Sequence, residues 1–437
     1  MTPAAPSPSF SELTRVFARI GCLSFGGPAG QIALMHSELV DERQWVDEEQ
    51  YLSALNFCHL LPGPEAQQLA TWIGWRLHGV KGGLVAGMLF VVPGALVILA
   101  LSILYAYAAN LDWFASLFLG VKAAVLAIVV QALIRIGARA LNTAFKKWVA
   151  AIAFAALFLF NLPFPVVVLG TGAIGILVAT RRPDWLALKS GNAGALSTAR
   201  PWGATARTLL IWAVIWVAPM LVVYLTLGPD HVLWDIGSFF SQLAIVTFGG
   251  AYAVLAYMAQ EAVQGFGWLS AGEMADGLGL AETTPGPLIM VTQFVGYLAA
   301  FRAPEPFTPL VAGIIGAGLT TWVTFAPCFL WIFALAPWME RLENARWLKG
   351  GLSALTAAVV GVIANLTVWF ALHVLFTRVD ERQYGPLRLY WPEADSFSWH
   401  AAVLAILSAV MIFRFQWNVI KTLAAAGLGG ILLGQIG

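Results

Sequence analysis

The sequence predicts an all-α integral membrane protein with two homologous halves, arranged as inverted repeats with broken or re-entrant helices and roughly 9–13 membrane segments. Composition is the first observation behind this prediction: 59% of the 437 residues are hydrophobic and only 11% are charged. A soluble domain carries about a quarter charged residues. The second observation is an internal repeat of helix-breaking motifs. Together they leave no room for a soluble catalytic domain.

Each half contains two motifs that interrupt apolar, helix-patterned sequence. The first copy has SFGGPAGQ at 24–31 and LLPGPE at 60–65, and the second has TFGG at 247–250 and TPGP at 284–287. A constant offset of 223 residues aligns the motif regions of the two copies. Inside a membrane, Gly and Pro breaks are tolerated only where the freed backbone groups lie within protein or line an aqueous cavity. A duplicated broken helix is therefore typical of secondary transporters.

The remaining segments follow in a regular order. Residues 1–9 are expected to be a disordered tail. The first half, 10–180, contains broken elements at about 13–35 and 51–77, spans at about 83–108 and 113–137, and a helical pair at 148–161 and 164–180. A cytoplasmic linker at 181–205 and an unpaired connecting span within 206–236 come next. The second half, 237–437, repeats the order with spans at 308–336 and 347–376 and a closing pair at 398–413 and 416–435.

The unpaired span determines how the halves are oriented. If both broken elements cross the membrane, or both re-enter, the odd span inverts the second half; if only one crosses, the halves are parallel. Positive charge favours the cytoplasmic side. Loops near 138–147 and 341–349 are basic, whereas 377–397 is balanced by acidic residues. This pattern favours inverted repeats.

Broken helices place half-helix ends at mid-membrane, where an N-terminal end attracts an anion. Pro64 precedes a helix expected to start near Glu65, and Gly27 and Gly30 would allow a ligand to approach the backbone. The alternative is that these motifs are kinks and packing notches without a ligand. Four motifs in duplicated register favour a substrate path.

Lys122 is the most informative single residue. It lies about ten residues from either end of its span, and a charge there costs at least about 2.5–3.5 kcal/mol without a partner or a cavity. The sequence allows an anion-binding or coupling role for Lys122, or a buried structural ion pair. The aligned position in the second half is Ser353, so the duplication does not require this cation.

Two carboxylates are further candidates for coupling. Glu65 could carry a proton or cap its own helix, and Glu38, which is repeated as Glu261, suggests architecture at least as strongly as chemistry. Gln31 could bind an oxyanion or pair across helices. Cys22, Cys58 and Cys328 have no metal-ligand spacing and are expected to be packing residues. The sequence contains no P-loop, dinucleotide fingerprint or nucleophile–base pair, so we expect no cofactor, metal or nucleic-acid partner.

Taken together, these motifs resemble the chromate ion transporter family in its long form with two fused homologous halves. The resemblance rests on SFGGPAGQIALM at 24–35, LLPGPEAQQLATWIGW at 60–75, GGLVAGMLFVVPG at 82–94, GVKAA at 120–124 and the second-half motifs. It implies an antiporter of the bacterial inner membrane that exports chromate, uses the proton-motive force and confers chromate resistance. The second copy departs from the pattern, because Ala251 and Tyr252 follow Gly250 in place of Pro-Ala.

Motifs and resemblance together predict a set of substrate-binding residues and three coupling candidates. The substrate-binding set is Gly26, Gly27, Pro28, Gln31, Pro62, Gly63, Pro64, Glu65, Gln68, Lys122, Gly249, Gly250, Pro285, Gly286 and Pro287. The coupling candidates are Glu65, Lys122 and Glu38. Expected partners are chromate or a sulfate-like oxyanion, protons, membrane lipid and a possible second copy in a homodimer.

Three other functions compete with chromate export. A sulfate or other oxyanion carrier is the main rival, because chromate and sulfate have nearly the same shape and charge. An intramembrane enzyme would need a clustered acid–base or metal constellation, which the sequence does not contain. An anion channel or a membrane scaffold would have no coupling to a second ion.

Overall fold

The computed structural model describes residues 8–109, 111–188, 202–248 and 251–434. These residues form two compact units, and each unit combines segments from both sequence halves. The first unit contains residues 1–100, 190–251 and 284–345, and the second contains 101–189, 252–283 and 346–437. The two units therefore divide the chain differently from the predicted repeat halves. Most of the predicted tail and linker lies outside the described residues.

The first unit is entirely helical within its described residues. Its elements are α1 (Phe10–Leu23), α2 (Gly27–His36), a π-helical turn η1 (Ser37–Glu42), α3 (Glu48–His59), most of α4 (Glu65–Ala108), α8 (Trp202–Leu227), α9 (Val232–Val246), η4 (Leu288–Met290), α12 (Val291–Arg302), α13 (Pro309–Leu335), η5 (Ala336–Trp338) and α14 (Met339–Asn344).

The second unit is helical apart from one β-hairpin. Its elements are the end of α4, α5 (Asp112–Ala140), α6 (Ala144–Phe158), α7 (Phe164–Arg181), η2 (Pro183–Leu186), α10 (Ala251–Gln260), η3 (Glu261–Gly265), α11 (Ala271–Thr283), α15 (Arg346–Leu375), β1 (Val379–Tyr384), β2 (Leu387–Pro392), η6 (Ala394–Ser396), α16 (Trp399–Phe413) and α17 (Val419–Gly434).

The predicted helix breaks are confirmed. The first motif separates α1 from α2, with Gly26 and Gly27 in the left-handed region at φ +85° and +68°, a conformation that is strained for residues with a Cβ. The first Pro-Gly-Pro motif separates α3 from α4. Pro64 directly precedes Glu65, the first residue of α4.

The long element α4 contains a reversal between the predicted segments 51–77 and 83–108. His78 and Gly79 leave the helical region, and residues on either side then lie against each other. A side chain built at Gly87 would overlap Thr71 Oγ1, although a straight helix would place these residues about 24 Å apart. Helices α12 and α13 repeat the arrangement, with Gly296 against Thr320. Small residues let the helix backbones approach closely.

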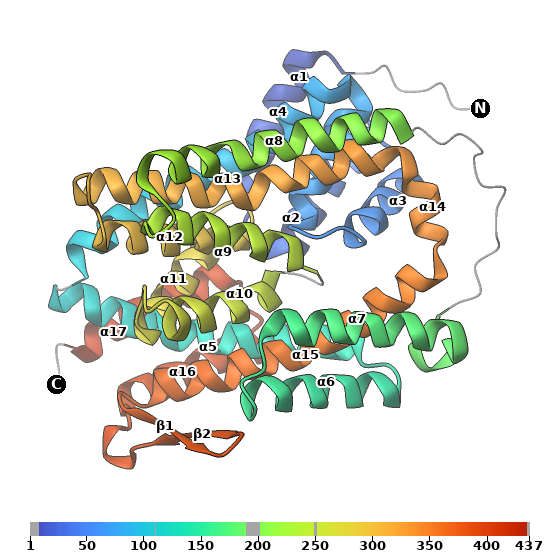
Figure 1. The fold of residues 1–437 in the computed structure, drawn as a ribbon. Coiled ribbons are helices and arrows are strands. Elements are labelled where there is room, and N and C mark those ends of the chain that lie inside the picture. The colour runs from blue at the N-terminus through green and yellow to red at the C-terminus, as the bar shows by residue number, and fades with distance from the viewer. Residues whose placement is uncertain (1–7, 110, 189–201, 249–250, 435–437) are drawn as a thin grey trace. The chain divides into compact units, whose positions relative to one another are not determined.

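The core of the first unit is formed by buried side chains of α1, α3, the first arm of α4 and α13. Phe17, Phe57, Ile73 and Ile332 are fully buried there. Helix α8 lies along α13, as Figure 1 shows. Trp212 on α8 stacks on Phe329 of α13 at 5.6 Å between ring centroids.

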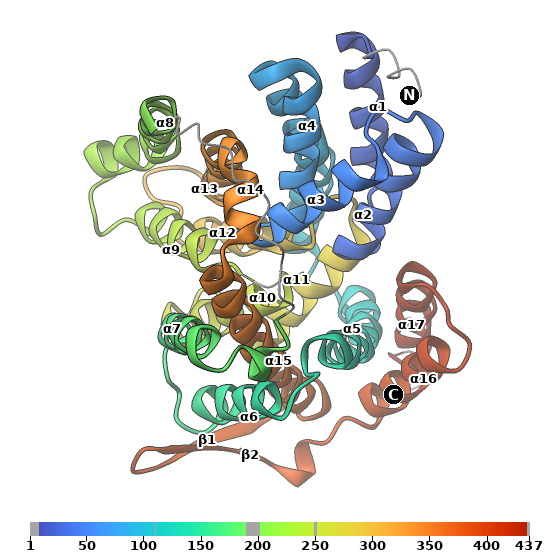
Figure 2. The same cartoon turned by 90° about the vertical axis from the view of Figure 1, so that its right-hand side faces the viewer.

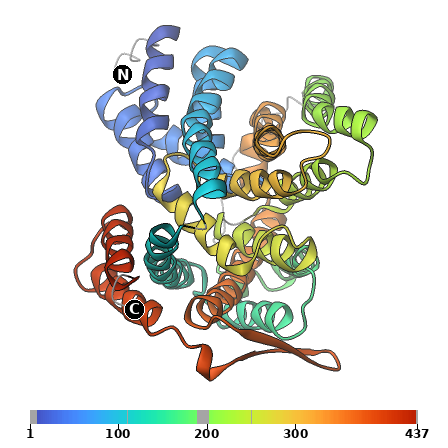
Figure 3. The same cartoon turned by 90° about the vertical axis from the view of Figure 1, so that its left-hand side faces the viewer.

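The second unit packs around α5 and α15. Helix α15 contacts α6 and α7 (Figure 1), and α5 contacts α16 and α17 (Figures 2 and 3). The α5–α17 contact is close because Gly120 faces the backbone of Ala426 without a side chain. Gly175 and Gly350, which also have no side chain, likewise allow α7 and α15 to approach closely.

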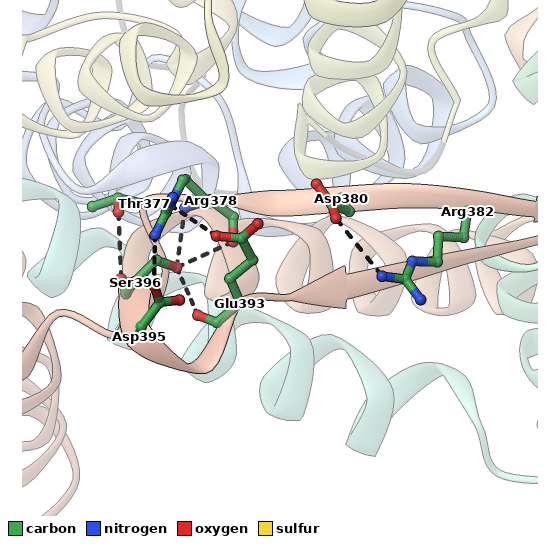
Figure 4. Close-up of polar contacts among 7 residues, drawn as sticks. All are labelled: Thr377, Arg378, Asp380, Arg382, Glu393, Asp395 and Ser396. Carbon is green, nitrogen blue, oxygen red and sulfur yellow. Dashed lines mark hydrogen bonds and ion pairs between the residues drawn. The ribbon is translucent and has the colours of Figure 1, made fainter.

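The sequence analysis missed the β-hairpin, treating 377–397 as a loop. Strands β1 and β2 pair antiparallel, from Val379 opposite Pro392 to Tyr384 opposite Leu387. Figure 4 shows Arg378 at the base of the hairpin, where it pairs with Glu393 at 2.9 Å and Asp395 at 2.8 Å. Glu393 and Asp395, whose charges suggested a solvated loop, therefore pair with Arg378 at the base of the hairpin.

Six helices among the described residues are long and apolar enough to cross a bilayer. They are α4, α5, α7, α8, α13 with its continuation to Asn344, and α15. Four shorter apolar helices accompany them, namely α9, the η4–α12 segment, α16 and α17. An all-α membrane protein is confirmed, with the small hairpin as its β component.

The reversal in α4 gives a packing prediction. Gly74→Val should destabilise the protein, because a side chain at Gly74 would overlap the Gly82 carbonyl and Ala86, and overpacking typically costs about 1–3 kcal/mol. A lower thermal unfolding midpoint in detergent would show this. Gly170→Val is the control, since its Cβ would meet no atom within 4 Å; equal midpoints for the two variants would contradict the packing account.

Candidate functional site

The four motifs meet within the first unit, where they are joined by two reciprocal backbone hydrogen bonds. The Gly63 amide donates to the Thr247 carbonyl at 2.8 Å, and the Gly286 amide donates to the Ser24 carbonyl at 2.8 Å. The repeat offset relates Gly63 to Gly286 and Ser24 to Thr247. Each Pro-Gly-Pro glycine therefore binds the residue that precedes the FGG sequence of the other half.

The local conformations at this crossing are the same in both copies. Ser24 and Thr247 end α1 and α9, and their hydroxyls donate one turn back to Ile20 at 2.7 Å and Leu243 at 2.6 Å. The glycines at the centres of the Pro-Gly-Pro motifs have φ values of +115° and +88°. Glycine adopts positive φ values readily because it has no Cβ.

Two glutamines complete the crossing. Gln31 Nε2 donates to the Gly286 carbonyl, and Gln68 Nε2 donates to the Pro62 carbonyl at 2.6 Å. Gln31 thus pairs across helices, one of the two roles considered for it. The amide oxygens of Gln67 and Gln68 are buried and have no hydrogen-bond partner within the described part of the chain, so the two side chains leave acceptors unused here.

Close packing surrounds these hydrogen bonds. A methyl group built at Gly63 would lie 2.8 Å from Cys328 Sγ, and Gly94 lies against the Pro285 carbonyl. Gln293 Nε2 donates to the Ala95 carbonyl at 2.9 Å. Cys58 and Cys328 are buried, and all three cysteines are free thiols.

The other predicted motif residues have clear positions. Gly26, Gly27 and Pro28 form the N-terminal end of α2. Pro62 and Pro285 precede the two bonded glycines, and Pro287 precedes η4. Gly249 and Gly250 lie outside the described residues.

Glu38 occupies an ion-pair cluster in the first unit. Its buried carboxylate pairs with Arg43 and lies 3.4 Å from the guanidinium of Arg19 on α1. Two cations therefore hold a single buried anion at the π-helical turn. This arrangement ties α1 to η1, as an architectural role requires.

Lys122 belongs to a different site, in the second unit. Its Nζ lies 3.2 Å from Asp276 Oδ1, and the hydroxyl of Tyr105 donates to Asp276 Oδ2 at 2.6 Å. Lys122 comes from α5, Asp276 from α11 and Tyr105 from the end of α4. The charge on Lys122 is thus paired, as its depth in the span requires.

These residues line an open cavity of about 440 Å³, walled by Phe114 and Phe118 as well. The Lys122 side chain is 24% exposed, whereas that of Asp276 is 6% exposed. The cation therefore faces the cavity, and the carboxylate lies behind it. An entering ligand would meet the ammonium group first.

The N-terminal end of α11 forms another part of the cavity wall. Ser270 and Glu273 make a reciprocal capping box there: the Ser270 amide donates to Glu273 Oε2 at 2.8 Å, and the Glu273 amide donates to Ser270 Oγ at 3.2 Å. A side chain at Gly272 would lie 3.4 Å from Lys122 Nζ. The positive pole of α11 and the Lys122 ammonium therefore occupy the same wall.

The sequence analysis did not select Asp276, Tyr105 or Ser270. Asp276 could have been found by the argument applied to Lys122, because it is an isolated charge in the apolar stretch 274–281. The S-x-x-E pattern at 270–273 also marks a helix start. The proximity of these residues to Lys122 depends on tertiary structure, which no spacing in the sequence indicates.

Several apolar spans, broken helices and a charged cavity define the class of this protein as a multi-pass membrane transporter. The sequence profile of the Chromate transporter family matches residues 11–176 and 234–431, and the chain belongs to that family. The family and its relatives are transporters and not enzymes, as expected.

Relatives from three bacteria cover most of the chain. A chromate transport protein of Pseudomonas aeruginosa is 32% identical over 99% of this chain and 94% of its own length. One of Cupriavidus metallidurans is 29% identical over 84% of each chain. A probable chromate transport protein of Synechococcus elongatus is 29% identical over 83% of this chain and 85% of its own. No solved structure matches the chain.

The crossing gives a prediction for Gly63. Gly63→Ala should slow transport and lower stability, because it places a Cβ at φ +115° and against Cys328 Sγ; the left-handed conformation alone costs about 1–2 kcal/mol. Gly385→Ala, at φ +60° in the hairpin turn with no atom near its Cβ, is the control for strain. Flux into liposomes should fall only for Gly63→Ala. Equal flux in both variants would remove Gly63 from the transport machinery.

The polar segment after α2 gives a prediction for pH. The hydrogen bond that His36 Nε2 donates to the Glu48 carboxylate at 2.5 Å, together with the Asp41 carboxylate, raises the pKa of His36 above its usual value. Protonated His36 stabilises the folded state through these contacts. This stabilisation is complete below the pKa of histidine in the unfolded chain, about 6.5, and is lost as the pH rises through the raised pKa of the folded state. Thermal unfolding midpoints should therefore fall less in His36→Gln than in the wild type between about pH 6 and 9. Identical pH profiles of the unfolding midpoint in the two proteins would show that the His36–Glu48 pair contributes nothing to stability.

Proposed function

We propose that this protein exports chromate, a tetrahedral oxyanion, across the bacterial inner membrane and thereby confers chromate resistance. The observation that carries the proposal is the Lys122 ammonium facing an open cavity in a membrane protein of this family. The relatives named as chromate transport proteins support the substrate. The membrane assignment rests on the apolar helices.

The donors around the cavity match an oxyanion in kind. Lys122 supplies a cation, and Ser270 and Tyr105 supply hydroxyls. The N-terminal end of the 13-residue helix α11 lies in the same wall, where it is capped by Ser270 and the Glu273 carboxylate. Phe114 and Phe118 give the cavity an apolar wall, and apolar surroundings strengthen the attraction between an ammonium group and an anion.

The motif crossing has a mechanical role in this proposal. The glycine amides that could have met an anion are engaged in the reciprocal hydrogen bonds, so we assign the crossing to the joint that rearranges during transport. Inverted halves related by this joint would exchange equivalent contacts between inward-open and outward-open states. The predicted contact residues at the motifs then act by positioning, not by holding the anion throughout the cycle.

The electrical part of the proton-motive force favours export. When a dianion leaves a cell with an inside-negative potential of about 100 mV, its electrical free energy falls by about 4.6 kcal/mol. Among the coupling candidates, Glu38 is neutralised by two arginines and Glu65 stabilises the positive end of α4. Lys122 therefore remains the strongest candidate.

A flux assay tests the proposal. The purified protein is placed in liposomes with an imposed voltage, and labelled chromate uptake is followed with and without excess sulfate. Flux that follows the voltage and resists sulfate is expected for a chromate exporter. Flux blocked equally by sulfate would make the protein a general oxyanion carrier, and no flux of either anion would contradict the proposal.

Lys122→Ala should reduce chromate flux to the level of empty liposomes, because it removes the cation from the cavity. The variant leaves Asp276 without a cationic partner, so Lys122→Gln combined with Asp276→Asn provides a neutral pair of similar size. The control is Lys147→Ala, which removes an exposed lysine elsewhere. Wild-type flux in the neutral-pair variant would exclude Lys122 from the substrate site.

A further inference from the structure

We propose that Asp276 takes up a proton when the oxyanion binds, so that the anion and one proton move through the protein together. The inference rests on the proposed function and concerns the same cavity. Its basis is the arrangement of one exposed cation, Lys122, and one buried carboxylate, Asp276, at 3.2 Å.

The first step is competition for Lys122. In the structure described here its ammonium group pairs with Asp276 Oδ1. A tetrahedral dianion in the cavity presents more negative charge to the same ammonium group. It can bind strongly only by replacing Asp276 as the main partner of Lys122.

The second step is the fate of the displaced carboxylate. Asp276 is 6% exposed, and a buried charge without a partner is strongly unfavourable. A dianion a few ångströms away adds repulsion. Uptake of one proton from cavity water at Oδ1 removes both penalties, while Tyr105 continues to donate to Oδ2.

Among the residues that the structure describes, no other group nearby can replace Asp276 in this role. Glu273 acts on Asp276 through its charge, but its carboxylate is engaged in the capping box. Helices α15 and α17 also pack against α11. Neither has a charged residue between 350 and 372 or between 422 and 434. Lys122, Tyr105 and Glu273 are therefore the titratable groups that surround it.

The pair occurs once in the duplicated chain. The repeat offset places Ser53 of α3 at the position of Asp276, and the Ser53 hydroxyl donates to Glu343 at 3.1 Å. The first copy therefore has an uncharged hydroxyl where the second has a protonatable acid. One proton accompanies each oxyanion.

This coupling differs from the antiport that the family resemblance implies. A dianion with one proton still carries a net charge of −1, so an inside-negative potential continues to favour its exit. A proton that bound only in the absence of the anion would require the opposite electrostatics. Lys122 is the only cation among the described residues that line the cavity, and the oxyanion and Asp276 both need it.

The test measures proton uptake during chromate binding by the purified full-length protein in weakly buffered solution. A pH-indicator dye reports the protons, and labelled chromate reports the binding. At alkaline pH, where free chromate is a dianion, the wild type should take up close to one proton per chromate. Asp276→Asn should take up none, and Asp184→Asn, which removes an exposed carboxylate outside the cavity, should match the wild type.

The pH dependence of chromate affinity is an independent test of the inference. Chromate binding to the wild type should weaken by up to about tenfold per pH unit at alkaline pH, whereas binding to Asp276→Asn should be nearly independent of pH. Wild-type binding without proton uptake would overturn the inference and leave the proposed function intact. Equal uptake in Asp276→Asn would assign the proton elsewhere. No chromate binding at any pH would overturn the proposed function together with the inference.

Discussion

A polar group inside a membrane protein must find a partner within the protein, because an unsatisfied backbone group or an unpaired charge costs several kcal/mol there. This constraint explains both polar sites of the structure. The broken helices free backbone amides, and the reciprocal hydrogen bonds of Gly63 and Gly286 use them. Lys122 brings a charge into a span, and Asp276 neutralises it.

The reciprocal hydrogen bonds have the pattern of a two-fold relation, in which residue i of one copy contacts residue j of the other and the reverse. Duplication alone does not require this, since each copy could close on itself. The exchange makes each half complete only in the presence of the other. All four residues lie in the first unit, which draws segments from both sequence halves. Such a joint suits a protein in which the halves exchange equivalent conformations.

Much of the fold could be predicted from the sequence because its determinants are local. Pro and Gly at the motifs set the ends of α1, α2, α3 and α4, and hydrophobic length set α5, α13 and α15. The β-hairpin was missed because Arg378, Glu393 and Asp395 are far enough apart in sequence to resemble solvated loop charges. Their pairing depends on strand register, which local composition does not determine.

The candidate site was predictable only in part. Depth in an apolar span selected Lys122 and predicted a partner or a cavity, and the structure has both. The identity of the partner depends on the packing of α11 against α5, a contact between segments about 150 residues apart in sequence. Motif glycines were expected to meet the substrate through their amides. Two of those amides instead bind carbonyls of the opposite half, because buried backbone donors are almost always hydrogen-bonded within the protein.

The central claim is that the oxyanion binds at Lys122, and locating the chromium atom of bound chromate tests it most directly. Crystals grown with chromate would be measured at the chromium absorption edge, so that anomalous scattering marks the anion. The account predicts a chromium peak in the α5–α11 cavity, with a chromate oxygen within hydrogen-bond distance of Lys122 Nζ. A peak elsewhere, with the Lys122–Asp276 pair unchanged, would contradict it.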